Sequence, residues 1–242
     1  MNPVTPSSIA LTAATRRTVH GRLPLPVWTA WTALAAAGVL AGAALLPRAA
    51  HAQVGANAPA RIGVVGPFSG PSADFGVPML NGIKLAVDEI NAVGGYLGRP
   101  LELVIKDDRA DPDQGRKVAQ ELLAEKVVAT IGFCNSGVAL KAIDLFQDAK
   151  SPLIVPCATA TAITAKYPAP DSYIFRVQGR DAIQAPFIVD DIVKRGWDKV
   201  AIFADKTGYG EGGYNDVVAA LATKNLKPEY VGRFDLGVKD LT

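Results

Sequence analysis

The sequence predicts a doubly wound α/β protein, in which helices cover both faces of a parallel β-sheet. Between residues 61 and 234, short apolar runs alternate with longer segments whose apolar residues recur every three or four positions. The short runs are continuously apolar, which is typical of strands buried on both faces. Strands separated by helices connect as parallel βαβ units, so the pattern indicates this fold class.

The expected elements follow one another in order along the chain. Gly94-Gly95 is expected to end helix 75–93, and Asp113 is expected to cap helix 113–126. The stretch 156–172 has no clear pattern, and we expect it to be irregular. The other expected strands are 61–65, 101–105, 127–133, 152–155, 173–177, 199–204 and 230–234, and the other expected helices are 136–150, 181–195 and 211–224.

Two rare residue types exclude several kinds of catalytic and metal site. Both histidines, His20 and His51, precede residue 53. A Ser-His-Asp triad, a Cys-His dyad and a histidine zinc site each need an imidazole. Cys134 and Cys157 are the only cysteines, too few for a four-cysteine zinc site. We therefore expect no enzyme, no metal site and no cofactor.

The net charge of +2 depends on the first 52 residues, which contain four arginines and no acidic residue. Without these arginines, 21 basic residues face 23 acidic residues. A protein that binds nucleic acid needs clustered Lys and Arg on its folded part. The sequence therefore predicts no nucleic-acid partner.

Residues 1–52 are expected to be a secretory signal peptide. Three arginines before residue 23 form a positive segment, residues 27–46 carry no charge, and Ala50-His51-Ala52 offers a small-x-small cleavage site. Cleavage after Ala52 would release a chain that begins at Gln53 in the periplasm. The alternative is an uncleaved membrane anchor, because twenty apolar residues can span a bilayer. The arginine pair leaves open whether export uses the twin-arginine or the general route.

Two expected loops at the carboxyl ends of strands carry hydroxyl groups, and ligands of doubly wound folds bind at this edge. Ser136 lies at the start of a helix, where free backbone N–H groups and the helix dipole favour a carboxylate or phosphate. The alternative is that Ser136 only caps its helix. Thr159 follows the next strand, so its loop should lie beside that of Ser136. For Thr159 the alternative is a polar turn.

Several short motifs follow one another in a fixed order along the chain. They are the run Ile62-Gly63-Val64-Val65-Gly66-Pro67-Phe68-Ser69-Gly70, then Asn81-Gly82, Asp88-Glu89-Ile90-Asn91, Gly94-Gly95, Asp107-Asp108, Asp111-Pro112 and Tyr209-Gly210-Glu211-Gly212. This ordered set resembles the periplasmic branched-chain amino-acid-binding proteins, which are the solute-binding components of ATP-driven (ABC) importers. The resemblance covers essentially all of 61–242. It implies the type 1 periplasmic binding fold, with two doubly wound parallel-sheet lobes joined by a hinge.

The resemblance also implies an organisation of the chain. Residues 53–179 would form the first ligand-binding lobe, and residues 180–242 a partial second lobe, with the hinge near Gly179–Arg180. The chain ends where a further helix is expected, so we expect a fragment of a longer protein. The family's acidic residue for the ligand ammonium would then lie beyond Thr242.

The resemblance assigns roles to five residues. Ser136, Ala158 and Thr159 would hold the carboxylate and ammonium of an amino acid. Tyr209 would contact the ligand when the lobes close; its alternative is an exposed loop tyrosine. Phe75 would line the pocket; its alternative is a core residue at a helix start. The expected ligand is a branched-chain or related amino acid or another small carboxylate, and the expected partner is a membrane permease.

Two other functions share some of these features. A ligand-binding domain of a membrane-anchored sensor would have the same fold and pocket, and an uncleaved 27–46 helix would favour it. An NAD-dependent oxidoreductase is suggested by Gly208-Tyr209-Gly210-Glu211-Gly212-Gly213, which fits G-x-G-x-x-G between a strand and a helix. Asp205-Lys206-Thr207 separate the strand from the first glycine, whereas a dinucleotide-binding turn is tight. The sensor and the oxidoreductase are therefore the alternatives to an importer component.

The two cysteines are a candidate disulfide. Cys134 and Cys157 each follow a strand end, and the two strands should be neighbours at a spacing of about 4.8 Å. Export would place them in an oxidising compartment. The alternative is a pair of small buried thiols. The family's own disulfide cannot form, because Arg109-Ala110 stand where relatives have one of its cysteines.

Overall fold

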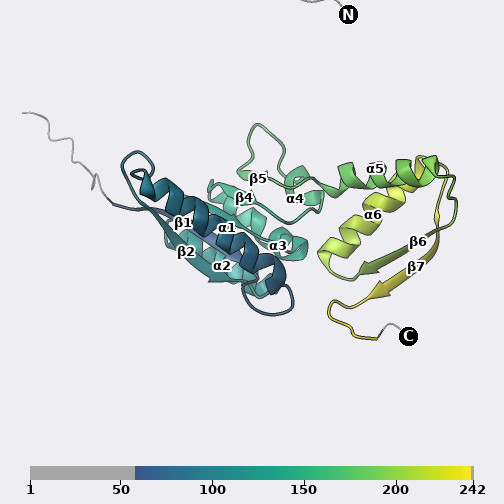
Figure 1. Ribbon diagram of the computed structural model, residues 1–242, viewed down its shortest axis with the longest axis horizontal. Helices are drawn as coiled ribbons and strands as arrows, with labels where there is room; N and C mark the ends of the chain where they lie inside the picture. Colours follow the sequence, from purple (N-terminus) through teal and green to yellow (C-terminus); the bar gives the residue numbers. More distant parts are fainter. Residues whose placement is uncertain (1–57, 241–242) are drawn as a thin grey trace, which may run out of the picture. The chain divides into compact units, whose positions relative to one another are not determined.

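The computed structural model describes residues 58–240, and two parallel sheets carry the fold within them. The first sheet has five strands in the order β2-β1-β3-β4-β5, and the second has two, β6 and β7 (Figure 1). All pairings within these sheets are parallel, which confirms the predicted fold class. The strands are β1 (Ala60–Gly66), β2 (Leu101–Asp107), β3 (Ala129–Gly132), β4 (Leu153–Val155), β5 (Ile174–Arg176), β6 (Val200–Asp205) and β7 (Pro228–Phe234). The helices are α1 (Ala73–Ala92), α2 (Pro112–Ala124), α3 (Ser136–Asp148), α4 (Ala162–Ala165), α5 (Asp181–Lys194) and α6 (Gly208–Ala222).

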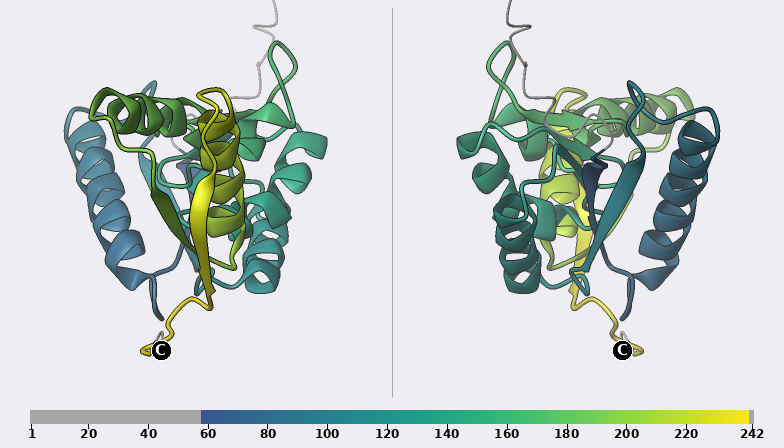
Figure 2. Two further views of the ribbon diagram at one scale, coloured as in Figure 1. Left: turned by 90° about the vertical axis from the view of Figure 1, so that its right-hand side faces the viewer. Right: turned by 90° about the vertical axis from the view of Figure 1, so that its left-hand side faces the viewer.

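Helices cover both faces of the five-stranded sheet. Figure 2 shows α1 on one side of it and α2 and α3 on the other. Val64 and Val65 on β1 are both fully buried, although consecutive strand residues point to opposite faces. This double burial explains why β1 carries no polar side chain between Ile62 and Gly66.

The direction of winding reverses between β1 and β3. β1 pairs with β2 on one side and with β3 on the other. The connections from β1 to β2 and from β3 to β4 therefore run toward opposite edges of the sheet. Such a reversal opens a crevice outside the carboxyl ends of the strands, where ligands of this fold class bind.

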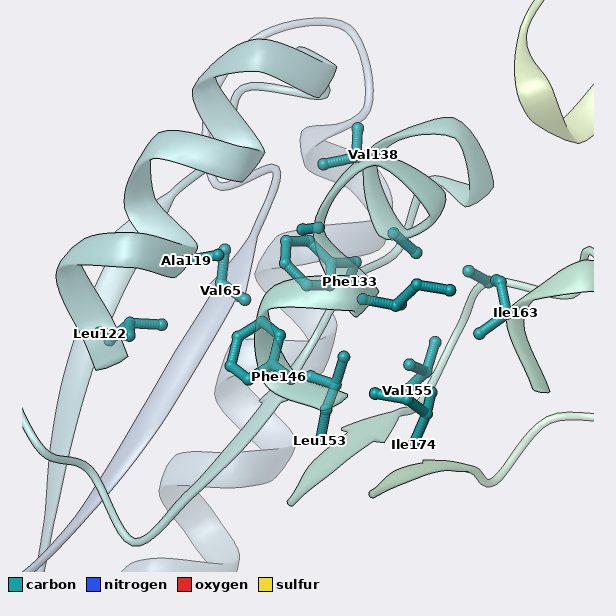
Figure 3. Packing of buried hydrophobic residues seen from close by; sticks show 14 of the residues in the cluster. Val65, Ala119, Leu122, Phe133, Val138, Phe146, Leu153, Val155, Ile163 and Ile174 are labelled. Carbon is teal, nitrogen blue, oxygen red and sulfur yellow. The ribbon is translucent and has the colours of Figure 1, made fainter. Parts of the chain in front are cut away.

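The main hydrophobic core lies between the sheet and helices α2 and α3. Phe133 and Phe146 meet edge to face with ring centroids 6.3 Å apart. Leu122, Leu153 and Ile163 are fully buried around them (Figure 3). Truncation of a buried Phe such as Phe146 to Ala costs about 3–5 kcal/mol. This core gives the loops at the sheet edge a rigid base.

A smaller core joins α5, α6 and β6. Ala185, Val189 and Leu221 are buried there, with Val200 and Ile202 packed against them. This cluster fixes α5 against α6 and β6.

Two local features differ from the sequence-based expectations. The N-cap of α2 is Asp111 rather than Asp113: a carboxylate oxygen of Asp111 accepts a hydrogen bond from the N–H of Gln114 at 2.7 Å. Pro112 then occupies the first helical position, where its missing N–H is not needed. The second feature is the short helix α4, which lies in the stretch expected to be irregular.

The predicted signal peptide, residues 1–52, lies outside the described residues. Within residues 58–240, no helix is both long enough and apolar enough to cross a membrane. β5 ends at Arg176 and α5 begins at Asp181, so the expected hinge position falls in the connection between them. The division into lobes at 179–180 stays a prediction.

Candidate functional site

A cavity of about 470 Å³ lies at the carboxyl ends of the strands. Pockets for small molecules typically enclose about 300–1,000 Å³. All five predicted site residues and both cysteines line this cavity. Its lining residues are Ser72, Phe75, Cys134, Asn135, Ser136, Cys157, Ala158, Thr159, Gln178, Asp181, Gln184, Asp205, Thr207, Tyr209 and Leu236.

Ser136 is the first residue of α3 and is almost completely buried. The N-cap position belongs to Asn135, whose side chain makes no capping hydrogen bond and instead donates to Ser72 Oγ at 3.1 Å. Ser136 Oγ accepts a hydrogen bond from the N–H of Ala160 at 3.3 Å. The reading of Ser136 as a simple helix cap is therefore wrong. The N–H groups of the first turn of α3, with no side-chain cap, lie at the positive end of the helix dipole.

Thr159 lies in the loop after β4, and several bonds to backbone carbonyls hold this loop in place. Arg176 donates to the carbonyl oxygens of Thr159 and Ala160 at 3.0 and 2.8 Å. The N–H of Asp181 also donates to the Thr159 carbonyl, at 3.0 Å. Thr159 Oγ1 is buried and makes no hydrogen bond of regular geometry within residues 58–240, although it interacts with the carboxyl of Asp181. A buried hydroxyl without a partner costs free energy, which a bound polar ligand would recover.

Asp181, which the sequence analysis did not select, is the acidic group beside Thr159. One of its carboxylate oxygens, Oδ2, is buried and makes no regular hydrogen bond in the described part of the chain. The pKa of Asp181 is raised above its ordinary value, and burial is the largest cause. The Asp216 charge also raises this pKa, whereas the Thr159 hydroxyl and the Arg176 charge lower it. The sequence signal was an acidic residue in the first turn of the helix that follows β5.

The N-terminus of α6 contacts the N-terminus of α3. α6 begins at Gly208, three residues earlier than expected, and Thr207 caps it by accepting a hydrogen bond from the N–H of Tyr209 at 3.2 Å. A Cβ atom on Gly208 would lie 2.8 Å from the Cα of Gly137 in α3. The two helix ends can approach this closely because Gly208 has no side chain; a Cβ on Gly137 would lie 3.3 Å from the backbone nitrogen of Gly208.

The start of α6 also changes the interpretation of the glycine-rich motif. All four glycines of Gly208-Tyr209-Gly210-Glu211-Gly212-Gly213 lie inside the helix. In a dinucleotide-binding motif the first glycine forms a tight turn between the strand and the helix. The helical placement therefore removes the structural basis of the oxidoreductase alternative.

Two aromatic side chains form the less polar part of the cavity wall. Phe75, in the first turn of α1, is 67% exposed, and Tyr209 is 54% exposed. Leu236 lines the same cavity. Phe75 is therefore not a core residue at a helix start, and Tyr209 lies in a helix rather than in a loop.

Sulfur atoms gather at the base of the cavity. Cys134 and Cys157 are free thiols, half-buried, with their Sγ atoms 3.0 Å apart. Met79 Sδ lies 3.6 Å from Cys134 Sγ and 3.9 Å from Cys157 Sγ. Within residues 58–240, His, Cys, Asp and Glu side chains form no group of three or more that is suited to hold a metal ion.

The geometry is that of a two-sided ligand cleft, and the comparison with known proteins identifies the family. The family model described as Periplasmic binding protein matches residues 59–242. The chain belongs to this family of periplasmic binding proteins.

Curated amino-acid-binding proteins are among the relatives of this chain. The chain is 34% identical over 182 residues to the leucine-, isoleucine-, valine-, threonine-, and alanine-binding protein of Pseudomonas aeruginosa, covering 74% of this chain and 48% of that one. It is 31% identical over 182 residues to Leu/Ile/Val-binding protein homolog 3 of Brucella melitensis, and this match covers 75% of this chain and 49% of that one. The chain thus spans about half the length of the curated relatives it matches.

Solved substrate-binding and solute-binding proteins share the fold. The branched-chain amino acid transporter substrate binding protein LivJ of Streptococcus pneumoniae, solved with isoleucine, matches with a TM-score of 0.66 at 28% identity, over 76% of this chain and 52% of that one. A solute binding protein of an ABC transporter from Rhodopseudomonas palustris, solved with 3,4-dihydroxybenzoic acid, matches with a TM-score of 0.66 at 28% identity. This match covers 76% of this chain and 49% of that one. These neighbours confirm the predicted type 1 fold.

Proposed function

We propose that this chain forms the ligand-binding part of the solute-binding component of an ABC importer, and that its ligand is a branched-chain or related amino acid. The observation that carries the proposal is the convergence of the α3 and α6 N-termini on a cavity that also contains the side chains of Ser136 and Thr159. No bond of the ligand is made or broken in this function.

The ligand carboxylate binds at the N-terminus of α3. Ser136 and Thr159 supply hydroxyl groups, and the uncapped N–H groups of α3 supply further donors. Charge-assisted hydrogen bonds of this kind replace the water around a carboxylate. The N-terminus of α6, at Gly208, adds a second positive helix end next to that of α3.

The ligand ammonium faces Asp181. The carboxyl of this residue lines the cavity, is partly desolvated and has an oxygen without a regular partner among the described residues. An ammonium group would provide the missing donor and the opposite charge. Asp181 therefore serves within the chain as the acidic partner that the resemblance placed beyond Thr242.

The ligand side chain contacts Phe75, Tyr209 and Leu236, which form the apolar part of the wall. The names of the relatives support a leucine, isoleucine or valine side chain. An aromatic acid is the second candidate, because one solved neighbour holds 3,4-dihydroxybenzoic acid. Asp181 favours the amino acid, since a benzoate carries no ammonium to balance its charge.

Binding and transport require a closing motion. Contacts between the lobes, such as Gly137 with Gly208, exist only when the cleft is closed, so a ligand that bridges the cleft shifts the population toward the closed state. We place the hinge near residues 179–180. The closed form is then what a membrane permease recognises.

A binding panel tests the proposed ligand class. The protein at its natural length is titrated by calorimetry with leucine, with 4-methylpentanoate, which is leucine without its amino group, and with 3,4-dihydroxybenzoate. We expect leucine to bind most tightly, and Asp181→Asn to weaken leucine much more than 4-methylpentanoate. Tighter binding of dihydroxybenzoate than of leucine would overturn the amino-acid assignment.

Export is tested separately. We propose that residues 1–52 are removed and that the periplasmic protein begins at Gln53. N-terminal sequencing of protein from the periplasmic fraction should read Gln53-Val54-Gly55. Recovery of the intact 27–46 segment in the membrane fraction would favour the anchored-sensor alternative.

A further inference from the structure

We propose that Cys134 and Cys157 form a reversible disulfide that ties the two carboxylate-binding loops together and sets the affinity of the pocket. The effect of the disulfide on ligand affinity rests on the proposed function. The bond itself follows from the position of the two thiols.

Each cysteine lies close in sequence to one of the two residues whose hydroxyl groups are proposed to bind the ligand carboxylate. Cys134 precedes Ser136 by two residues, and Cys157 precedes Thr159 by two residues. The cysteines follow adjacent parallel strands, β3 and β4. A bond between them would therefore fix the distance between the two loops at their bases.

The two sulfur atoms already lie close to bonding distance. Their separation is 3.0 Å, and a disulfide needs about 2.05 Å. Both residues line the cavity, so a reagent in the cleft can reach them. Met79 packs against both sulfur atoms.

The hydrogen bond between the thiols favours one of them as the attacking group. Cys134 donates its S–H to Cys157 Sγ. This bond lowers the pKa of the Cys157 thiol, and the same bond, followed by burial, raises the pKa of Cys134. Cys157 is thus the thiol that more readily becomes the attacking thiolate.

The oxidant is a small or protein disulfide, R–S–S–R. The Cys157 thiolate attacks one of its sulfur atoms, forms a mixed disulfide and releases R–S⁻. Cys134 then loses its proton and attacks Cys157 Sγ, which releases the second R–S⁻. Two protein thiols are oxidised by two electrons, and R–S–S–R leaves as two R–SH that carry the two protons.

Alkylation and mass spectrometry test the bond directly. Protein taken from the periplasm without reductant is denatured in a maleimide and weighed intact. We expect no adduct before reduction and two after it. Cys157→Ser should give one adduct without reduction, and Met79→Leu, which keeps both thiols, should behave like the wild type. Two adducts on unreduced wild-type protein, or a copper ion retained by the thiols in native mass spectra, would overturn the bond.

Leucine titrations before and after reduction test the effect on the pocket. Reduction should weaken binding roughly two- to tenfold, since the loops lose pre-organisation. The Cys134→Ser/Cys157→Ser variant should bind equally in both conditions. Equal wild-type affinity in both redox states would overturn the coupling. Absence of leucine binding in both states, with the bond present, would overturn the proposed function instead.

Discussion

The hydroxyl oxygen of Ser136 accepts a hydrogen bond from the backbone N–H of Ala160 at 3.3 Å. This contact joins the start of α3 to the loop after β4, and both groups are buried. The two loops whose hydroxyl groups are proposed to bind the carboxylate of the ligand are therefore in direct contact. The contact, together with the pairing of the neighbouring strands β3 and β4, helps to hold the two loops in place.

Gly208→Ala should weaken ligand binding. The new Cβ would lie 2.8 Å from the Cα of Gly137, so the N-termini of α3 and α6 would have to move apart. Overpacking of this kind costs about 1–3 kcal/mol, which corresponds to a loss of affinity of roughly five- to hundredfold. Calorimetry with leucine measures this loss of affinity. Gly213→Ala is the matched control on the same helix, because its Cβ meets nothing within 4 Å; equal affinities of the two variants would contradict the close-contact argument.

Arg176→Ala should lower both stability and affinity. The change leaves the carbonyl oxygens of Thr159 and Ala160 without the guanidinium that holds them. Hydrogen bonds from a charged group contribute about 1.5–3 kcal/mol, so the free energy of unfolding should fall by at least about that amount. Urea unfolding measures the loss. Arg195→Ala removes an exposed ion pair with Asp191 and an exposed contact with the Trp197 ring, and should lower stability by only about 1 kcal/mol. A similar loss in both variants would argue against a special role of Arg176.

Asp108 should make the protein less stable as the pH rises from about 4 to 6. Burial raises the pKa of this carboxyl from 3.8 to about 6, with Asp107 and Asp111 as smaller contributions. The folded state then binds the proton more tightly than the unfolded state, so stability present at low pH is lost as Asp108 ionises. Asp108→Asn should remove this loss while its side-chain oxygen still accepts from the N–H of Ala110.

Urea unfolding of wild type and Asp108→Asn between pH 4 and pH 7 tests this dependence. The stability advantage of the variant should grow with pH, up to about 3 kcal/mol at neutral pH, since one pKa unit corresponds to 1.36 kcal/mol. A difference that stays constant across this range would show that Asp108 does not titrate in this window.

The sequence was sufficient to predict the parts of the fold and site that depend on local order. Continuous apolar runs separated by helices predicted the parallel sheet, and strand-end positions predicted that Ser136, Thr159, Cys134 and Cys157 lie together. These predictions needed only the rule that the carboxyl ends of parallel strands meet at one edge.

The parts that were missed depend on packing between distant segments. Asp181 enters the cavity because its N–H bonds to the Thr159 carbonyl, 22 positions earlier in the chain. The early start of α6 depends on the cap by Thr207 and on space next to Gly137. Neither contact leaves a periodic pattern, so the sequence alone indicated only an acidic residue and a glycine-rich segment.

The central claim is that Ser136 and Thr159 hold the carboxylate of an amino acid, and leucine calorimetry on Ser136→Ala/Thr159→Val tests it most directly. Ser151→Ala is the matched control, because Ser151 lies before β4, at the opposite edge of the sheet from the cavity. We expect the double variant to bind leucine more than roughly tenfold more weakly than the wild type, because each charge-assisted hydrogen bond contributes about 1.5–3 kcal/mol. The control should bind as the wild type does. Unchanged affinity in the double variant would contradict the claim.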